Sequence, residues 1–410
     1  MIRSSQKKID WLLCYQCILA VAAVFTFYSN LDIYLYNAVH TPSPLILVLL
    51  FGLASTPLIF SIFSRIIYFP LPLLIWCAGY ISISFISFFL FLSSAAAYQE
   101  VRNRILGVIF LLLMLLIFSR YHIVQLWARR AVFVTVLMTI GNNIYEFFNP
   151  LAFGLLNDSG RPAGFYIDPN QTGYALLVGM IFSVGILRQK YRVPFVAITG
   201  IGIFSTFSRG AMLSWFVVMV IFIITSVIPR SQLLYWLVGL GIILIFAGSA
   251  FETVLNLDRL QELGLVNDNI RRRLEWAEKP SDSEDSAASR LEVAKLGWQL
   301  FTEHPLWGNG IGSTLDWNVA FSTHNMYIYY MADHGILGAF IMPLLICALT
   351  VGARGESKYI GLALAADVLL WCLFSHTVSR DRYTLIMFAL MAAMNMTSQL
   401  EQKYQIGHKS

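Results

Sequence analysis

The sequence has few charged residues. Asp, Glu, Lys and Arg make up 12% of its 410 residues, against about 25% in a typical soluble protein. It has only five cysteines, none of them in the long polar segment 251–324, and they form neither a zinc-binding pattern nor a disulfide framework. P-loop, Rossmann and kinase motifs are missing, and so are an Asp-X-Asp pair and a His/Cys cluster. These absences argue against nucleotide-dependent and metal-dependent transfer chemistry.

Apolar residues dominate the rest of the chain. Hydrophobic residues make up 58% of it, the mean hydropathy is +0.68, and apolar runs of membrane-spanning length recur along its whole length. We therefore predict an all-α polytopic membrane protein. About 12 transmembrane helices are expected, at residues 10–29, 45–64, 70–94, 104–119, 130–148, 172–187, 193–208, 210–229, 232–250, 325–349, 359–375 and 384–398.

Lysine and arginine positions predict the orientation. With both termini in the cytoplasm, the inside segments hold fifteen of these residues and the short outside segments hold six. Arg102 and Arg104 fit least well, because this arrangement puts them outside. The net charge of +5 follows from the topology and requires no nucleic-acid partner. The first nine helices occupy residues 1–250, a large periplasmic loop with amphipathic helices occupies 251–324, and the last three helices with a cytoplasmic tail occupy 325–410.

His324 ends the long polar segment and opens a hydrophobic stretch that contains Gly335 and Gly338. Eleven residues of α-helix make three turns plus about 20°, so Gly335 would lie below His324 on one stripe, which Gly338 continues. A stripe of small residues lets another helix pack closely. We predict a titratable ring at the membrane surface above a helix-packing motif. Asp333 and His334 lie in the same stretch with no visible relay, which favours a packing or hydrogen-bonding role.

Further polar residues fall on the predicted outer face. Guanidinium groups bind phosphate oxygens bidentately and stay charged, and a histidine can accept a proton from a hydroxyl near neutral pH. Several arginines and one histidine on one face therefore indicate a substrate with a phosphate or pyrophosphate. The residues of this face are Arg161, the run 164–171, Ser208-Arg209-Gly210, Arg290, His324 and Arg380-Asp381-Arg382.

Each of these residues also has a plainer interpretation. Arg209 can reach lipid headgroups from the end of a span, and Arg290 can simply begin an interfacial helix. The arginines near residue 380 can be ordinary loop residues. His304 and His376 are further histidines on the same predicted face and serve as backup candidates.

The ordered set of motifs resembles the O-antigen ligase/polymerase superfamily of bacterial inner-membrane glycosyltransferases. The resemblance covers most of the chain by span count and loop placement, and its specific part runs from Ser208 to Gly338. The residues that carry it are Ser208-Arg209-Gly210-Ala211, Arg290 opening an amphipathic helix, the run 305–312, His324-Asn325 with Gly335 and Gly338, and the segment Gly164–Asn170.

The resemblance implies a GT-C-like fold and an inverting, metal-independent O-antigen ligase that needs no cofactor. Such an enzyme moves O-antigen polysaccharide from undecaprenyl diphosphate to lipid A–core oligosaccharide at the periplasmic face. His324 would be the general base on the acceptor hydroxyl, and Arg209 and Arg290 would bind the diphosphate and stabilise charge on the leaving group. The residues predicted to bind substrate are Arg161, Asn170, Asn325, Asp381 and Arg382.

Three other functions stay open. A polymerase of the same superfamily would extend the glycan on its lipid carrier, and the complete His-Asn/Gly motif favours the ligase over it. A protein O-oligosaccharyltransferase shares the motif but is often longer, whereas only about ten residues follow the last predicted span. A transporter of lipid-linked glycan would have internal repeats and a cavity near the bilayer midplane, but the polar candidates cluster at one face.

Overall fold

The computed structural model describes residues 11–63, 70–91, 94–149, 152–153, 161–232, 284–317 and 323–407. Within these ranges every regular element is helical, as the sequence predicts. Most of the predicted span 232–250 and the first part of the predicted outer loop lie outside the described residues.

The described elements follow one another along the chain in this order. The α-helices are α1 (Trp11–Ala23), α2 (Leu31–Val39), α3 (Pro44–Ala54), α4 (Thr56–Phe63), α5 (Leu71–Leu90), α6 (Ala95–Phe118), α7 (His122–Phe148), α8 (Pro169–Ser183), α9 (Gln189–Ser205), α10 (Arg209–Ile224), α14 (Glu284–Glu303), α15 (Met326–His334), α16 (Ile341–Thr350), α17 (Glu356–Trp371) and α18 (Arg382–Gly407). A π-helix, η1 (Val24–Tyr28), and two 3₁₀-helices, η2 (Val184–Ile186) and η3 (Gly335–Phe340), extend some of them.

Five helical stretches are long and apolar enough to cross a membrane. They are Trp11–Tyr28, Leu71–Leu90, Ala95–Phe118, His122–Phe148 and Met326–Thr350. Pro44–Phe60 and Arg209–Ile224 are shorter apolar helices. The protein is therefore an all-helical integral membrane protein in its described parts. The predicted count of twelve spans and the GT-C-like fold stay predictions.

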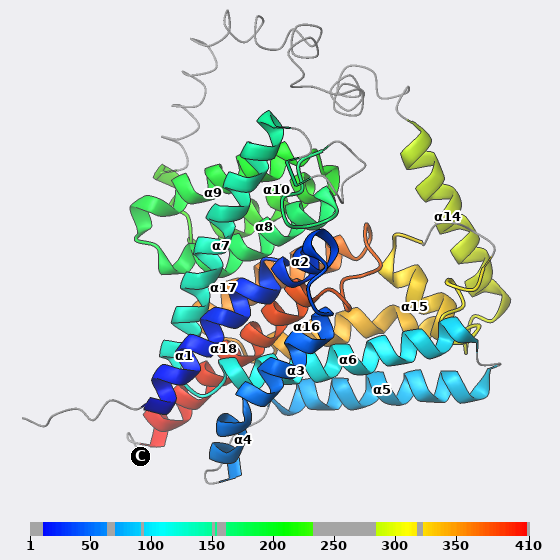
Figure 1. Cartoon of the computed structure of the whole chain (residues 1–410), viewed down its shortest axis with the longest axis horizontal. Helices are drawn as coiled ribbons and strands as arrows, with labels where there is room; N and C mark the ends of the chain where they lie inside the picture. Colours follow the sequence, from blue (N-terminus) through cyan, green and yellow to red (C-terminus); the bar gives the residue numbers. More distant parts are fainter. Residues whose placement is uncertain are drawn as a thin grey trace, which may run out of the picture.

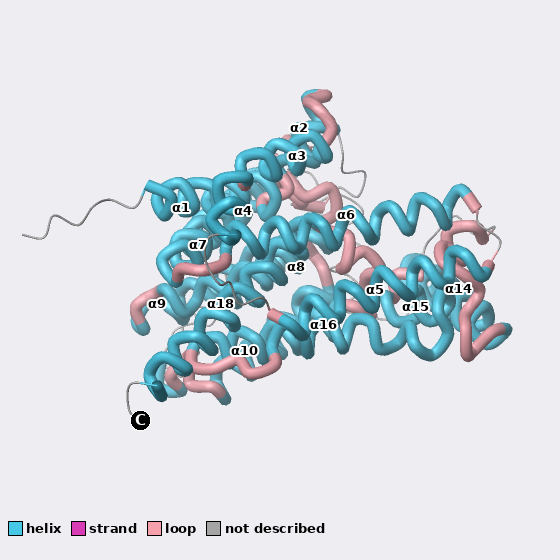
Figure 2. The backbone as a smooth tube through the Cα atoms, turned by 90° about the horizontal axis from the view of Figure 1, so that it is seen from below, coloured by secondary structure: helices cyan, strands magenta, loops and turns pink. Residues whose placement is uncertain are grey.

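The helices form an elongated bundle with two distinct ends (Figures 1 and 2). In both views α5 and α6 extend side by side toward the end that carries α14 and α15, while α1 and the C-terminal end of α18 lie at the other end. Nearly every residue of α8 is buried, and α18 packs against α6, α16 and α17. A helix that is apolar on all sides belongs in the core, so α8 and the first half of α18 form the centre of the bundle.

The predicted helix 325–349 is interrupted. α15 ends at His334, Gly335 has a φ of 64°, and α16 resumes only at Ile341 after a 3₁₀ segment. A positive φ cannot continue a right-handed helix and suits glycine, which has no Cβ. His324 itself lies before α15 with a φ of 47°. The prediction of one continuous helix with His324, Gly335 and Gly338 on a single stripe is therefore wrong.

The two glycines serve close backbone contacts instead. A Cβ on Gly335 would overlap the backbone carbonyl of Leu306, and a Cβ on Gly338 would overlap that of Tyr330. The turn that follows α14 thus packs directly against the end of α15. The backbone N–H of Asn309 donates to the carbonyl of Ala332 (2.8 Å), which is one of the carbonyls that a helix end leaves without an intrahelical partner. The glycine-rich run 305–312 therefore packs against the C-terminal end of α15 and donates a hydrogen bond to it.

Candidate functional site

Two helix N-termini carry candidate residues. Asp168 caps α8, because its Oδ1 accepts hydrogen bonds from the backbone N–H of Asn170 (2.8 Å) and from its Nδ2 (2.9 Å). Ser208 caps α10 through its hydroxyl, which accepts from the backbone N–H of Ala211, and Arg209 is the first residue of that helix. Capping side chains determine where a helix begins. The local sequence therefore places Asp168 and Arg209 at helix ends.

Arg161 holds the segment before α8 against the turn before α10. Its side chain is buried, and its Nε and Nη2 donate to the carbonyl oxygen of Thr206 at 3.0 and 2.8 Å. Its Nη2 also donates to Oδ1 of Asn170 at 3.2 Å. These bonds give Arg161 and Asn170 a structural role, and their predicted role in substrate binding stays a prediction.

His324 and Arg290 come from a different part of the chain. α14 begins at Glu284, so Arg290 lies in its second turn and does not open the helix as predicted. α14 packs against α15, whose N-terminus follows His324 directly. Asn325 caps α15, because its Oδ1 accepts hydrogen bonds from the backbone N–H groups of Tyr327 (3.0 Å) and Ile328 (3.1 Å). Asn325 therefore positions the residue before it, and its predicted contact with substrate stays a prediction.

Charged residues from these elements affect the pKa values of His324 and Arg290. Burial lowers the pKa of the half-buried His324, the positive charge of Arg290 lowers it further, and Asp168 acts in the opposite direction. Partial removal from water also lowers the pKa of Arg290, where Asp168 raises it and Arg209 lowers it. Electrostatic effects of this kind require short distances. Arg290 therefore lies near Asp168, Arg209 and His324, although these residues are far apart in the sequence.

His376 adds a second imidazole to this site. The ring centroids of His324 and His376 are 5.5 Å apart, with the rings nearly perpendicular. Burial, and after it the positive charges of Arg380 and His324, lower the pKa of His376 to about 3, against a smaller effect of Glu100. The ring is therefore neutral at neutral pH. The sequence identified His376 only as a backup, because no local motif marks it and its position depends on the loop between α17 and α18.

Asp381 lies at the end of the same loop and Arg382 is the first residue of α18, and both have partners within the chain. Oδ2 of Asp381 accepts hydrogen bonds from the hydroxyls of Thr377 (2.7 Å) and Tyr383 (2.9 Å), and burial raises its pKa to about 6. Nε of Arg382 donates to Oδ2 of Asp32 at 2.7 Å. These contacts hold the loop against α2 and the start of α18, while the predicted role of both residues in substrate binding stays a prediction.

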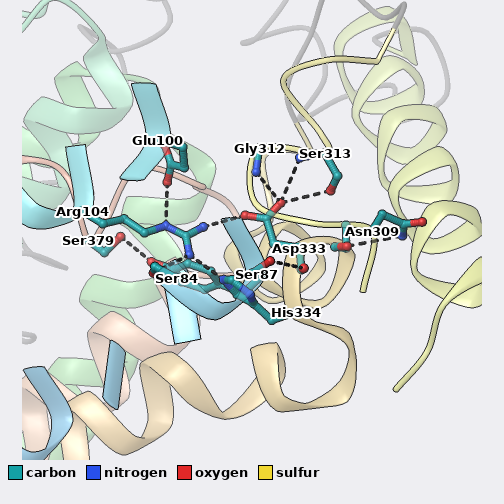
Figure 3. Close-up of polar contacts among 12 residues, drawn as sticks. Ser84, Ser87, Glu100, Arg104, Asn309, Gly312, Ser313, Asp333, His334 and Ser379 are labelled. Carbon is teal, nitrogen blue, oxygen red and sulfur yellow. Dashed lines mark hydrogen bonds and ion pairs between the residues drawn. The ribbon is translucent and has the colours of Figure 1, made fainter. Parts of the chain in front are cut away.

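A buried ionic network joins α6 to α15 and to the turn 305–313 (Figure 3). Nε of Arg104 donates to Oε1 of Glu100 at 3.0 Å, and its Nη2 donates to Oδ2 of Asp333 at 2.5 Å. The other oxygen of Asp333 accepts from the backbone N–H groups of Gly312 (3.0 Å) and Ser313 (3.1 Å). The hydrogen-bonding role that the sequence favours for Asp333 is therefore confirmed.

Arg104 is the centre of this network. It lies inside α6 with a fully buried side chain, and its predicted position in a short outside segment stays a prediction. Its Nη1 is 2.5 Å from Nε2 of His334. Because a guanidinium has no acceptor, Nε2 accepts this bond and the His334 ring carries its proton on Nδ1. The hydrogen-bonding role favoured for His334 is thus confirmed as well.

Arg380 links the network to the site at His324. Its Nη1 donates to Oε2 of Glu100 at 2.9 Å, while the other oxygen of Glu100 binds Arg104. Arg380 also lies over the ring of Tyr329, which in turn lies 6.2 Å from the ring of His376. The buried ion pairs therefore lie beside the pair of histidines. Within the ranges that the structure describes, no group of three or more His, Cys, Asp or Glu side chains is placed to hold a metal ion.

Replacing Asp333 with asparagine tests the ionic network. The variant keeps the shape of the side chain but leaves the buried charge of Arg104 without one of its two counter-ions. Breaking a buried ion pair costs about 3–5 kcal/mol, so we expect a clearly lower unfolding midpoint of the purified protein in detergent.

Asp367→Asn is the matched control. Asp367 is equally buried, but neither of its oxygens has a hydrogen-bond partner among the described residues. An unpaired carboxyl in an apolar interior takes up a proton, so replacing it with an amide removes no charge and leaves the midpoint nearly unchanged. Equal losses in both variants would contradict the network.

Comparison with known families agrees with the motifs. Residues 194–343 match the family model described as O-antigen ligase. The matched segment extends from α9 into α16 and contains Arg209, Arg290 and His324. No curated protein is similar enough to the chain to count as a match. The O-antigen ligase domain at residues 194–343 supports membership of the chain in the O-antigen ligase superfamily, as its motifs predict.

Proposed function

We propose that the protein is an O-antigen ligase. It would transfer O-antigen polysaccharide from undecaprenyl diphosphate to lipid A–core oligosaccharide at the periplasmic face of the bacterial inner membrane, as an inverting and metal-independent glycosyltransferase. The observation that carries the proposal is that Arg290 lies near His324 and near Arg209, with Asp168 close to both Arg290 and His324. The family match supports transfer chemistry of the ligase/polymerase superfamily.

The two arginines suit the lipid diphosphate. A guanidinium stays charged at every physiological pH and presents several N–H donors, so it can hold phosphate oxygens without depending on a metal. When the bond between sugar and diphosphate breaks, negative charge grows on the leaving oxygen. Positive groups that are already in place stabilise that charge without having to reorganise. Arg209 and Arg290 fit this role, because Arg209 lies close enough to Arg290 for its positive charge to lower the pKa of Arg290.

His324 fits the role of general base. Burial and the charge of Arg290 keep its pKa low, so the ring is neutral and able to accept a proton at neutral pH. The oxygen of the acceptor hydroxyl bonds to the anomeric carbon, its proton passes to His324, and undecaprenyl diphosphate leaves from the opposite side. One direct displacement inverts the configuration at the anomeric carbon. The neutral His376 nearby adds no positive charge that would hinder this proton transfer.

Replacing His324 tests the proposal. In His324→Ala, and in His324→Asn, which tolerates a positive φ better, we expect transfer to fall by about 100-fold or more, since a general base contributes this much. Polymer then disappears from lipid A–core, and long polymer accumulates on the lipid carrier. The measurement is the lipopolysaccharide and lipid-linked glycan profile of a strain that carries only the variant.

His304→Ala is the control, because His304 is an exposed histidine at the end of α14. It should support normal decoration. If His324→Ala also does, the assignment of the base is wrong. If the His324 variants instead leave a single repeat unit attached to lipid A–core, the protein is a polymerase of the same superfamily.

The pH dependence tests how Arg290 acts on the base. The pKa of His324 lies below its ordinary value of 6.5, so the acid side of the kcat/KM profile should fall only below that pH. Arg290→Gln removes a positive charge that lowers this pKa. The pKa then rises, and activity is lost at a higher pH than in the wild type, in addition to any loss in donor binding.

Lys295→Gln provides the comparison for this profile. Lys295 is an exposed residue of the same helix, and its removal changes the net charge by the same amount. Its acid midpoint should equal that of the wild type. An unchanged midpoint in Arg290→Gln would show that the arginine does not control protonation of His324.

A further inference from the structure

A polar cavity lies in a part of the molecule that the proposed reaction does not use. Its volume is about 350 Å³, and the starts of α7 and α17 form its walls together with α18 at Met394–Ser398. Charged and hydroxyl side chains line most of it, including Arg129, Arg354 and Glu356. A volume of this size accommodates a small polar ligand or one lipid headgroup.

The cavity and the His324 site lie at opposite ends of the same helices. α17 starts at Glu356 in the cavity wall and ends at Trp371, five residues before His376. Sixteen helical residues span about 24 Å. α8 connects the same two regions, because Asp168 caps its N-terminus and the carbonyl of Phe182 near its C-terminus accepts from Nε of Arg129 at 2.7 Å. If the first site faces the periplasm, the cavity faces the cytoplasm.

Two of the charged side chains on the lining, Arg129 and Glu356, form an ion pair with each other. Arg129 is buried, and its Nη1 and Nη2 donate to the two carboxylate oxygens of Glu356 at 2.8 and 2.6 Å. Arg354 is different, since within the described residues it makes neither a hydrogen bond nor an ion pair, and its side chain is exposed at the cavity. After Arg129 and Glu356 cancel, the remaining full charge on the lining is positive.

The backbone adds to this positive field. α7 starts at His122 and α17 starts at Glu356, and in neither helix does the N-cap residue provide a side-chain acceptor. The first N–H groups of a helix have no intrahelical partner, and the helix dipole makes this end attractive to anions. Two such ends line one cavity beside Arg354, which has no hydrogen-bond or ion-pair partner among the described residues.

We propose that this cavity binds an anion that carries a phosphate group. The charge of Arg354, the two helix N-termini and the hydroxyls of Ser357 and Ser398 all favour an acceptor-rich, negatively charged group. The phosphate can belong to an anionic lipid of the cytoplasmic leaflet or to a soluble compound. The proposal does not depend on the reaction at His324 and goes beyond it.

Ligand-dependent stabilisation of the full-length protein tests the proposal. The unfolding temperature is measured in nanodiscs of phosphatidylcholine, of phosphatidylcholine with phosphatidylglycerol, and of phosphatidylcholine with inorganic phosphate in the buffer. A ligand that binds only the folded state raises this temperature. A rise with phosphatidylglycerol alone identifies a lipid headgroup, and a rise with inorganic phosphate identifies a soluble anion.

Two variants connect any such rise to the cavity. Arg354→Gln removes one charge-assisted contact, so the apparent affinity should fall about 3- to 10-fold. Ser398→Leu keeps every charge and fills the space, so it should abolish the rise. Lys358→Gln, an exposed charge on α17 that does not line the cavity, should behave like the wild type.

Two results would overturn the proposal. One is that neither phosphatidylglycerol nor inorganic phosphate raises the unfolding temperature of the wild type. The other is that Arg354→Gln and Lys358→Gln reduce the rise equally, which would mean that general surface charge causes it.

Discussion

The positive charge of Arg104 inside the helix bundle is the constraint on which the rest of the structure depends. A charge in an apolar interior is tolerated only with a counter-ion and satisfied hydrogen bonds. Arg104 obtains them from Glu100 on its own helix and from Asp333 on α15. Asp333 in turn binds the backbone of the turn 305–313, and Glu100 binds Arg380. Satisfying one arginine therefore requires three distant parts of the chain to meet.

This requirement places the candidate site. α15 is held at its C-terminal end by the network and by the turn after α14, so its N-terminal end, where His324 lies, has little freedom to move. Arg380 brings the loop with His376 to the same place. The proposed base thus lies next to the buried ion pairs, whereas the charges that act on it come from Asp168, which caps α8, and from Arg290 in α14. The ion pairs and these charged residues belong to different elements.

Much of the candidate site could be predicted from the sequence, because its residues lie in local motifs. Arg209 follows a helix-capping serine, and His324 precedes a capping asparagine, so each is recognisable from its neighbours. Arg104 and Glu100 were missed and His376 was identified only as a backup, since their partners lie far away along the chain and no local pattern connects them. Two signals were present in the sequence: Arg104 fitted the predicted topology poorly, and Asp333 had no visible partner.

For the fold too, features that depend on neighbouring residues could be predicted from the sequence, whereas a feature that depends on a distant contact could not. Hydropathy predicted helices correctly, because burial in a membrane depends on runs of apolar residues. It could not predict the break at Gly335, where the approach of Leu306 requires a residue without a side chain. A continuous apolar run gives no sign of such a contact, and only the positive φ of Gly335 reveals it.

The most direct measurement of the central claim is transfer by the purified protein. The reaction would contain lipid-linked O-antigen, lipopolysaccharide that lacks O-antigen, and a chelator of divalent metals. The account predicts that polymer becomes attached to lipid A–core at the same rate with and without the chelator, as undecaprenyl diphosphate is released. A reaction that requires an added metal, or that only lengthens the glycan on its lipid carrier, would contradict it.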